Sequence, residues 1–148
     1  MSYSCFVSRV YNKIKDKIRR NFEFKKRMKR ILIIDDDSST TESISSYLRE
    51  IGYDVATAAN GIEGLEMVKK FDPDLIISDI RMPKLNGVEL YFVLKGMKFN
   101  KPIIFISSYD FKDAESSSLR ITAYIEKPIN IFELDDYIKQ ALVKSDAA

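Results

Sequence analysis

The sequence predicts an α/β fold in which helices cover both faces of a doubly wound parallel sheet of five strands. Short apolar segments alternate with longer segments of helical periodicity, and this alternation repeats five times from Lys29 onward. The strongest apolar segments are continuous, as expected for strands that are buried on both faces of a parallel sheet. Right-handed crossovers between parallel strands place the helices on both faces.

The strand segments are short and end in polar residues. Three of them are strongly apolar, and the second and fifth have a weaker pattern. The strands are expected at Ile31–Ile34, Asp54–Ala58, Leu75–Ile77, Ile103–Ile106 and Ala123–Ile125.

Each strand is followed by a segment in which apolar residues recur every three or four positions. The first of these begins with Asp or Ser as a cap and stops before Gly52. The fourth is polar and serine-rich, and has the weakest helical pattern. The helices are expected at Ser38–Ile51, Gly61–Phe71, Val88–Met97, Asp110–Leu119 and Ile131–Val143.

The composition limits the chemistry. The 148 residues are 45% hydrophobic, which is enough for the core of one domain. Cys5 is the single cysteine, so no internal disulfide forms. The absence of histidine excludes serine–histidine and cysteine–histidine catalysis. The sequence shows neither an apolar run of about 18 residues nor the pattern of a secretory signal, so we expect a cytoplasmic protein.

The charge divides the chain into two parts. Residues 1–30 contain eleven basic and two acidic residues, a net charge of +9, whereas residues 31–148 contain thirteen basic and twenty acidic residues, a net charge of −7. We therefore expect a basic N-terminal extension at 1–28, a folded domain at 29–144 and a short tail at 145–148.

Within the extension, Val7, Val10, Tyr11, Ile14 and Ile18 recur at helical spacing among basic residues. One interpretation is an amphipathic helix on an anionic membrane, and another is nonspecific contact with nucleic acid. A third interpretation is a flexible tail. A fourth is that translation begins natively at Met28, so that the extension is not part of the native protein. The sequence alone favours these last two interpretations.

Polar residues follow four of the predicted strands, and the carboxyl ends of parallel strands meet at one edge of the sheet. They are Asp35, Asp36, Asp79, Ser107 and Lys127. Clustered carboxylates repel one another unless a cation joins them, and oxygen ligands suit Mg²⁺. One carboxylate next to the metal can then attack phosphorus, with lysine neutralising the transferred group.

Each of these residues has an ordinary explanation when it is taken singly. The acidic run Asp35–Asp37 complements a helix N-terminus, Asp79 is a loop residue, and Ser107 bonds to the backbone. The hypothesis of a site therefore rests on their joint occurrence at one edge.

With these motifs the sequence resembles a response-regulator receiver domain over about residues 29–143. The resemblance rests on five motifs in the order and near the spacing of the family: Ile31–Asp36, Leu75–Pro83 (LIISDIRMP), Gly87, Pro102–Ser108 (PIIFISS) and Tyr124–Pro128 (YIEKP). Their combination implies the flavodoxin-like receiver fold, βα repeated five times.

The resemblance also implies roles for individual residues. Asp79 is expected to be the phosphoacceptor. The expected Mg²⁺ ligands are Asp35, Asp36, Asp79 and the backbone carbonyl of Arg81. Ser107 and Lys127 are expected to contact the phosphoryl group, and Tyr124 to be the switch aromatic residue. The bond between Lys127 and Pro128 is often cis in relatives.

The function that this resemblance implies is a phosphorelay response regulator of the stand-alone type. Its donor is expected to be a histidine kinase or a histidine phosphotransfer protein, and it catalyses only its own phosphorylation and dephosphorylation, so it is not an ordinary enzyme. Only about five residues follow Val143, so no DNA-binding output domain is expected and the output is contact with an unknown downstream protein. Homodimerisation through the last helices is a further expectation left open by the family.

Two alternatives remain at this point. In a haloacid-dehalogenase-like Mg²⁺-dependent phosphatase, Asp35 is the nucleophile and Asp37 the general acid, while Ser107 and Lys127 contact phosphate. That family's last acidic motif is missing, because Asp135 and Asp136 lie within a helical segment. The other alternative is a degenerate receiver that binds partners without being phosphorylated.

Overall fold

The computed structural model describes residues 3–23, 27–108 and 122–147, which form five strands and five helices. The strands are β1 (Arg30–Ile34), β2 (Asp54–Ala58), β3 (Leu75–Asp79), β4 (Ile103–Ser107) and β5 (Ala123–Glu126). The helices are α1 (Tyr3–Glu23), α2 (Ser38–Glu50), α3 (Gly61–Phe71), α4 (Gly87–Gly96) and α5 (Ile131–Ala147).

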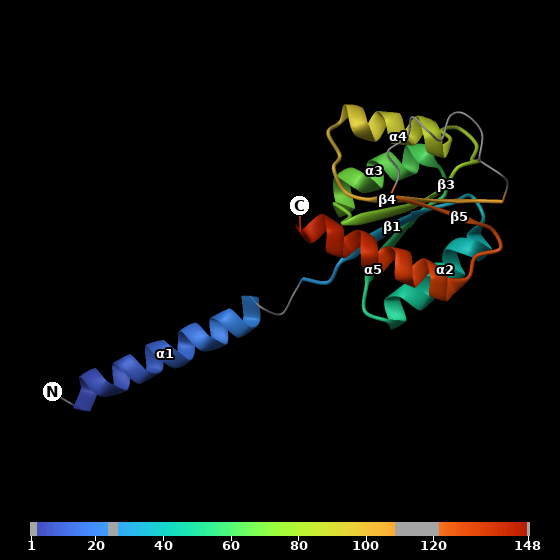
Figure 1. Cartoon of the computed structure of the whole chain (residues 1–148). Coiled ribbons are helices and arrows are strands. Elements are labelled where there is room, and N and C mark those ends of the chain that lie inside the picture. Colours follow the sequence, from blue (N-terminus) through green and yellow to red (C-terminus); the bar gives the residue numbers. More distant parts are fainter. Residues whose placement is uncertain (1–2, 24–26, 109–121, 148) are drawn as a thin grey trace.

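The five strands form one parallel sheet in the order β2-β1-β3-β4-β5 (Figure 1). The order reverses at β1, which lies between β2 and β3, with Leu32 opposite Ile76 and Ile34 opposite Ser78. The predicted fold class, a doubly wound parallel sheet, is therefore confirmed. Ligands of such sheets bind outside the carboxyl ends of the strands where the order reverses.

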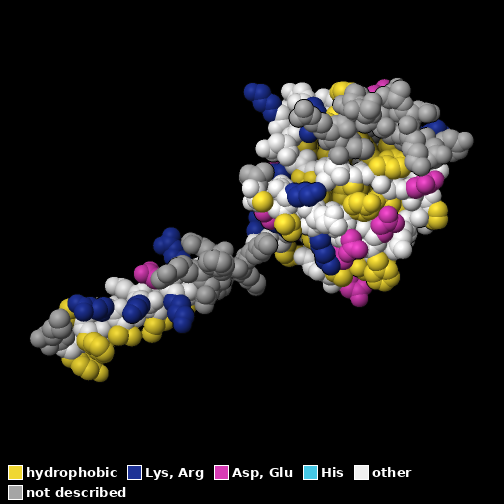
Figure 2. Space-filling model, viewed as in Figure 1, with side chains coloured by type: hydrophobic (Ala, Val, Ile, Leu, Met, Phe, Trp, Pro, Cys, Tyr) yellow, Lys and Arg dark blue, Asp and Glu magenta, His cyan; other side chains and the backbone are white. Residues whose placement is uncertain are grey.

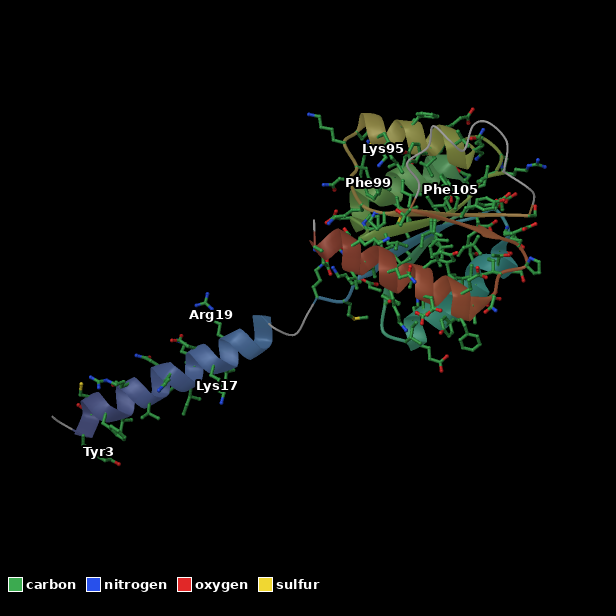
Figure 3. The ribbon with its side chains drawn as sticks, viewed as in Figure 1. Tyr3, Lys17, Arg19, Lys95, Phe99 and Phe105 are labelled. Atoms are coloured by element: carbon green, nitrogen blue, oxygen red, sulfur yellow. The ribbon has the colours of Figure 1, made fainter. Side chains whose placement is uncertain are left out.

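Two apolar layers hold the helices against the sheet, α2 and α5 on one face and α3 and α4 on the other (Figure 1). Alternate residues of each strand supply the two layers: Ile31 and Ile33 face α2 and α5, whereas Leu32 and Ile34 face α3 and α4. Figure 3 shows Phe105 of β4 inside the domain, where it belongs to the layer under α3 and α4. Burial on both faces explains the continuous apolar segments in the sequence.

Side-chain caps define where the helices begin. The Asp37 carboxylate accepts a hydrogen bond from the backbone N–H of Ser39 at the start of α2, and Asn60 caps α3 in the same way. At α4, Asn86 and Glu89 form a reciprocal capping box. These caps fix the first turns of α2, α3 and α4.

The observed bounds differ slightly from those predicted. Strand β3 includes Asp79, and α5 continues to Ala147, beyond the Val143 expected from its apolar pattern. An ion pair of 2.6 Å joins Lys29 Nζ, before β1, to Asp146 Oδ1 in the last turn of α5. Residues 145–147, predicted as part of a short tail, are therefore helical. The helix expected at 110–119 lies outside the described residues.

Helix α1 lies away from the sheet and its four covering helices (Figure 1). Its described side chains, at residues 3–19, are all exposed. No helix in the described part of the chain is both long enough and apolar enough to cross a membrane. The apolar side chains of α1 are therefore exposed along with its basic ones.

Candidate functional site

Three carboxylates meet at the carboxyl ends of β1 and β3, beside the point where the strand order reverses. Asp35 and Asp36 directly follow β1, and Asp79 is the last residue of β3. One carboxylate oxygen of each lies within 4.8 Å of the others. Asp35 and Asp79 are buried, whereas Asp36 is exposed. The fold therefore brings together the acidic residues that the sequence predicts at this edge.

Lys127 joins two of these carboxylates. Its Nζ donates hydrogen bonds to Asp35 Oδ2 at 2.9 Å and to Asp79 Oδ2 at 3.1 Å. The backbone N–H of Lys127 donates to the carbonyl of Ser107 at 2.7 Å, which ties Lys127 to the end of β4. The bond between Lys127 and Pro128 is cis. One cation is thus shared by two buried carboxylates that come from different strands.

The charges of the cluster favour the binding of another cation. Burial raises the pKa of Asp79, the charge of Asp35 raises it further, and the opposing effect of Lys127 is too small to cancel them. Desolvation lowers the pKa of Lys127, but its hydrogen bonds and ion pairs with Asp35 and Asp79 outweigh this and raise the pKa above its usual value. The cluster therefore combines three carboxylates with one lysine, so its negative charge exceeds its positive charge.

This donor set fits Mg²⁺. The ion prefers oxygen ligands, commonly one or two carboxylates together with water and phosphate oxygens, and the three clustered carboxylates offer such oxygens. A shallow pocket of about 270 Å³ adjoins the acidic pair and is lined by Asp35, Asp36, Thr57 and Glu63 among others. The end of β2 and the start of α3, which contribute Thr57 and Glu63, were not predicted from the sequence to border the site.

The two buried carboxylates are held differently. Asp35 Oδ1 accepts the N–H of Asp37 at 2.9 Å, and its Oδ2 accepts from Lys127. Asp79 Oδ1 accepts a longer bond of 3.3 Å from the N–H of Arg81. The Asp79 oxygen is therefore held more weakly than that of Asp35. The role predicted for the Arg81 carbonyl at the metal stays a prediction.

The carboxylate of Asp37 does not belong to this cluster. Its carboxylate accepts from Ser39 N at 3.0 Å and from Thr40 Oγ1 at 2.7 Å, and the Thr40 bond is the main reason why the pKa of Asp37 is lowered. The ordinary explanation of the acidic run, helix capping, thus holds for Asp37 alone. The phosphatase alternative needs Asp37 as a general acid, whereas here the residue serves as a cap.

Gly87 brings the start of α4 directly against Asp79. Its N–H donates to the carbonyl of Ile80 at 2.8 Å. A Cβ atom at this position would lie 2.5 Å from the carbonyl oxygen of Asp79 and 2.9 Å from Ile80 Cα. The sequence motif contains this glycine, but only the packing shows that its missing side chain fixes the approach of α4 to the phosphoacceptor candidate.

The two residues predicted to read the state of the site lie on β4 and β5. Ser107 ends β4 and is buried, and the register places it opposite Glu126. Tyr124 lies opposite Phe105 and packs, partly buried, against the apolar layer under α3 and α4. Ser107 thus lies on the strand next to β3, and Tyr124 lies on the strand beyond it.

A family model described as the response regulator receiver domain matches residues 31–139. The chain is 34% identical over 122 residues to the alkaline phosphatase synthesis transcriptional regulatory protein PhoP of Bacillus subtilis, covering 81% of this chain and 51% of that protein. The chain therefore spans about half the length of the curated relatives that it matches.

Solved structures give the same result. A CheY-like response regulator receiver domain protein from Methanospirillum hungatei is 33% identical, with a TM-score of 0.75 over 81% of this chain and 98% of that one. The response regulator protein TrrA from Thermotoga maritima, solved in complex with Mg²⁺-BeF, is 34% identical, with a TM-score of 0.70 over 77% of this chain and 99% of that one.

Proposed function

The chain belongs to the response regulator receiver domain family, and we propose that its Asp79 accepts a phosphoryl group in a Mg²⁺-dependent signalling reaction. The observation that carries this proposal is the shared cation: Lys127 Nζ lies 2.9 Å from Asp35 and 3.1 Å from Asp79, within a cluster of three carboxylates. A receiver domain is a signalling module rather than a conventional enzyme, and its catalysis is limited to its own phosphorylation and dephosphorylation.

Asp79 is the better nucleophile of the two buried carboxylates. Its Oδ1 is held by one long hydrogen bond, whereas both oxygens of Asp35 are held more tightly. Attack of a carboxylate oxygen of Asp79 on phosphorus forms an acyl phosphate and breaks the bond from phosphorus to the donor. Asp35 then remains a ligand, as expected for a group that keeps its geometry through the reaction.

The other residues of the site would bring positive charge to the phosphoryl group, either by holding Mg²⁺ or through Lys127. Asp35, Asp36, Asp79 and the carbonyl of Arg81 would hold Mg²⁺, which supplies neutralisation of the phosphoryl oxygens when it is bound. Lys127 is placed to keep contact with Asp35 while its ammonium group turns toward the phosphoryl oxygens. The raised pKa of Asp79 supports this assignment. Burial and the charge of Asp35 disfavour the ionised carboxylate of Asp79, and a bound metal cation would favour it.

The output is a change at β4 and β5. Ser107 lies at the end of β4 and Tyr124 lies on the neighbouring strand β5, so hydrogen bonding of Ser107 to a phosphoryl oxygen would free space into which Tyr124 can move. Tyr124 is already partly buried against the layer under α3 and α4. The surface over these strands is therefore the one that changes between the two states.

The proposed donor is another protein. The family implies a histidine kinase as partner, and the chain has no histidine of its own. We propose that a phosphohistidine on such a kinase, or on a phosphotransfer protein, donates to Asp79. A downstream protein would then bind the altered surface, and homodimerisation through α5 is one form that this contact can take.

The test is to incubate the protein with Mg²⁺ and acetyl phosphate, and to map the modified residue by mass spectrometry after trapping the acyl phosphate by borohydride reduction. We expect modification of Asp79, complete loss in Asp79→Asn, and no modification when Mg²⁺ is chelated. Asp72→Asn, an exposed aspartate far from the cluster, is the matched control and keeps the modification.

Two outcomes would contradict the proposal. Modification of Asp35 with turnover of phosphate esters would support the phosphatase mechanism. Absence of any adduct, together with absence of Mg²⁺-dependent binding of beryllium fluoride, would leave a receiver that acts without phosphorylation.

A further inference from the structure

Helix α1 carries an apolar stripe that no described element covers. At 100° per residue its large apolar side chains occupy about 140° of the helix circumference. They are between 40% and 84% exposed, and Figure 2 shows hydrophobic side chains gathered along one side of this helix. The apolar stripe consists of Tyr3, Phe6, Val7, Val10, Tyr11, Ile14 and Ile18.

Cations border the stripe on both sides. On the helical projection Lys13 lies along one border and Lys15 along the other, and Lys17 lies just inside the border beside Lys13. Figure 3 shows Lys17 and Arg19 projecting to opposite sides of α1. The acidic residue of this stretch, Asp16, lies about 160° from the centre of the stripe at Ile14. The borders of the stripe are therefore cationic, and the acidic charge lies on the opposite side.

We propose that α1 binds flat on the surface of an anionic lipid bilayer. In this arrangement the stripe enters the boundary between headgroups and acyl chains, and the bordering ammonium groups reach the lipid phosphates. Lysine suits such a border, because its methylene stem lies along apolar surface while its charge stays in water. A helix of 21 residues lying in the plane would be about 30 Å long.

The charges exclude a spanning arrangement and favour lipid over a second copy of the chain. A helix with charges at this frequency does not cross a bilayer, and none in the described residues meets the requirements for crossing. If two copies paired through their stripes, Lys13 and Lys17 of one helix would meet lysines of the other, with no acidic residue at either border to offset them.

The apolar stripe also distinguishes lipid from nucleic acid. Contact with a phosphate backbone uses cations and would leave seven large apolar side chains in water. Residues 31–148 carry a net charge of −7, the difference between thirteen basic and twenty acidic residues, so that part of the chain is repelled by an anionic surface. Binding is therefore assigned to α1, with the receiver domain held beside the membrane.

The test is sedimentation of the full chain with vesicles of phosphatidylglycerol and phosphatidylcholine in equal parts, compared with vesicles of phosphatidylcholine alone. We expect binding to the anionic vesicles that weakens as salt rises from about 0.05 M to about 0.5 M, because surface charges are then screened. Binding to phosphatidylcholine alone should be at least about tenfold weaker.

A pair of variants separates the stripe from charge. Ile14→Glu and Asn12→Glu each add one negative charge, the first at the centre of the stripe and the second on the opposite side. Loss of apolar contact should weaken vesicle binding by about tenfold or more in Ile14→Glu, and by no more than about threefold in Asn12→Glu. Both variants should retain phosphorylation of Asp79, so this result is independent of the proposed function.

Several results would overturn the proposal. These are equal weakening in the two variants, no binding to anionic vesicles, or a dimer that Ile14→Glu dissociates while vesicles are not bound. Binding to duplex DNA that Ile14→Glu leaves unchanged, without vesicle binding, would assign α1 to nucleic acid. Native N-terminal peptides that begin only at Met28 would also overturn it, because α1 would then be absent from the protein in the cell.

Discussion

Helices α1 and α5 have similar apolar spacing and opposite surroundings. In α5, residues such as Leu134 and Ile138 are buried against the sheet. In α1, the equivalent spacing of Val10, Ile14 and Ile18 leaves these side chains exposed. The apolar period thus predicts that a helix has one side to bury, and it does not identify the surface that buries it.

The charges beside the apolar positions distinguish the two helices. On α5, Lys139 pairs with Asp135 one turn earlier at 2.6 Å, so both signs occur side by side. On α1, Lys13 and Lys15 lie along the two borders of the stripe, and no acidic residue lies at either border. Mixed charge suits a helix whose outer side faces water, whereas borders of one sign suit a helix that meets a surface of the opposite sign.

The largest effect is expected from truncating an equivalent residue in each helix. Ile138→Ala should lower the free energy of unfolding by about 2–5 kcal/mol, because it removes buried methyl groups of the core. Ile14→Ala should change it by no more than about 0.5 kcal/mol, as for a surface site. Urea denaturation followed by circular dichroism measures both. A loss above about 1 kcal/mol in Ile14→Ala would show that α1 packs on the domain, against the comparison.

The next largest effect is expected from replacing the two glycines of α4 by alanine, because their surroundings differ. In Gly87→Ala the new methyl group meets backbone atoms of Asp79 and Ile80, which cannot rotate away, so stability should fall by about 1–3 kcal/mol. Gly96→Ala meets nothing within 4 Å, and should raise stability by up to about 1 kcal/mol. Thermal unfolding of both variants is the measurement. Equal changes in stability in the two variants would mean that the start of α4 is not closely packed against Asp79 and Ile80.

A somewhat smaller effect is expected from metal binding. At ten times its dissociation constant, Mg²⁺ should stabilise the wild-type protein by about 1.4 kcal/mol. The stabilisation should be largely lost in Asp79→Asn and unchanged in Ile14→Ala, because the ligands belong to the domain and not to α1. Thermal unfolding with Mg²⁺ and with chelator measures it. Stabilisation that persists fully in Asp79→Asn would place the metal elsewhere.

The smallest effect concerns pH. Burial and the charge of Asp35 raise the pKa of Asp79 in the folded protein above its usual 3.8. Its contribution to stability is then complete below the unfolded pKa and is lost as pH rises through the folded pKa. In Mg²⁺-free buffer, the free energy of unfolding of the wild type, minus that of Asp79→Asn, should therefore decrease as pH rises from about 3.8.

Urea titrations of the two proteins across this pH range give the difference directly. The opposite trend would show that Lys127 outweighs burial at Asp79. Ile14→Ala should show the same pH dependence as the wild type, since α1 lies away from the cluster (Figure 1).

Most of the fold could be predicted from the sequence. The bounds of β2 and α3 agree residue for residue, and those of β1, β4 and α2 agree within one residue. Among them, β1 and β4 are continuous apolar segments and α2 and α3 begin after capping residues, which are local signals. The end of α5 was less predictable, because Asp146 is held there by Lys29, a contact between residues 117 positions apart.

The site could be predicted in its members and less well in its contacts. The acidic run after β1 reads as one motif, but its residues separate: Asp35 bonds to Lys127 while Asp37 turns to cap α2. Nothing in the local sequence divides these roles. The pocket residues Thr57 and Glu63 belong to no motif, and they border the site because β2 pairs with β1.

Neighbouring residues along the chain set the alternation of strands and helices, the residue types at the strand ends and the amphipathic pattern of α1, so the amino-acid sequence alone predicts them. The contact of Lys127 with Asp35 and Asp79, which lie 92 and 48 positions away, arises only in the folded domain. The same holds for the apolar side of α5, which is covered, while that of α1 is exposed. These contacts could not be predicted from local sequence, because strand order and register bring distant residues together.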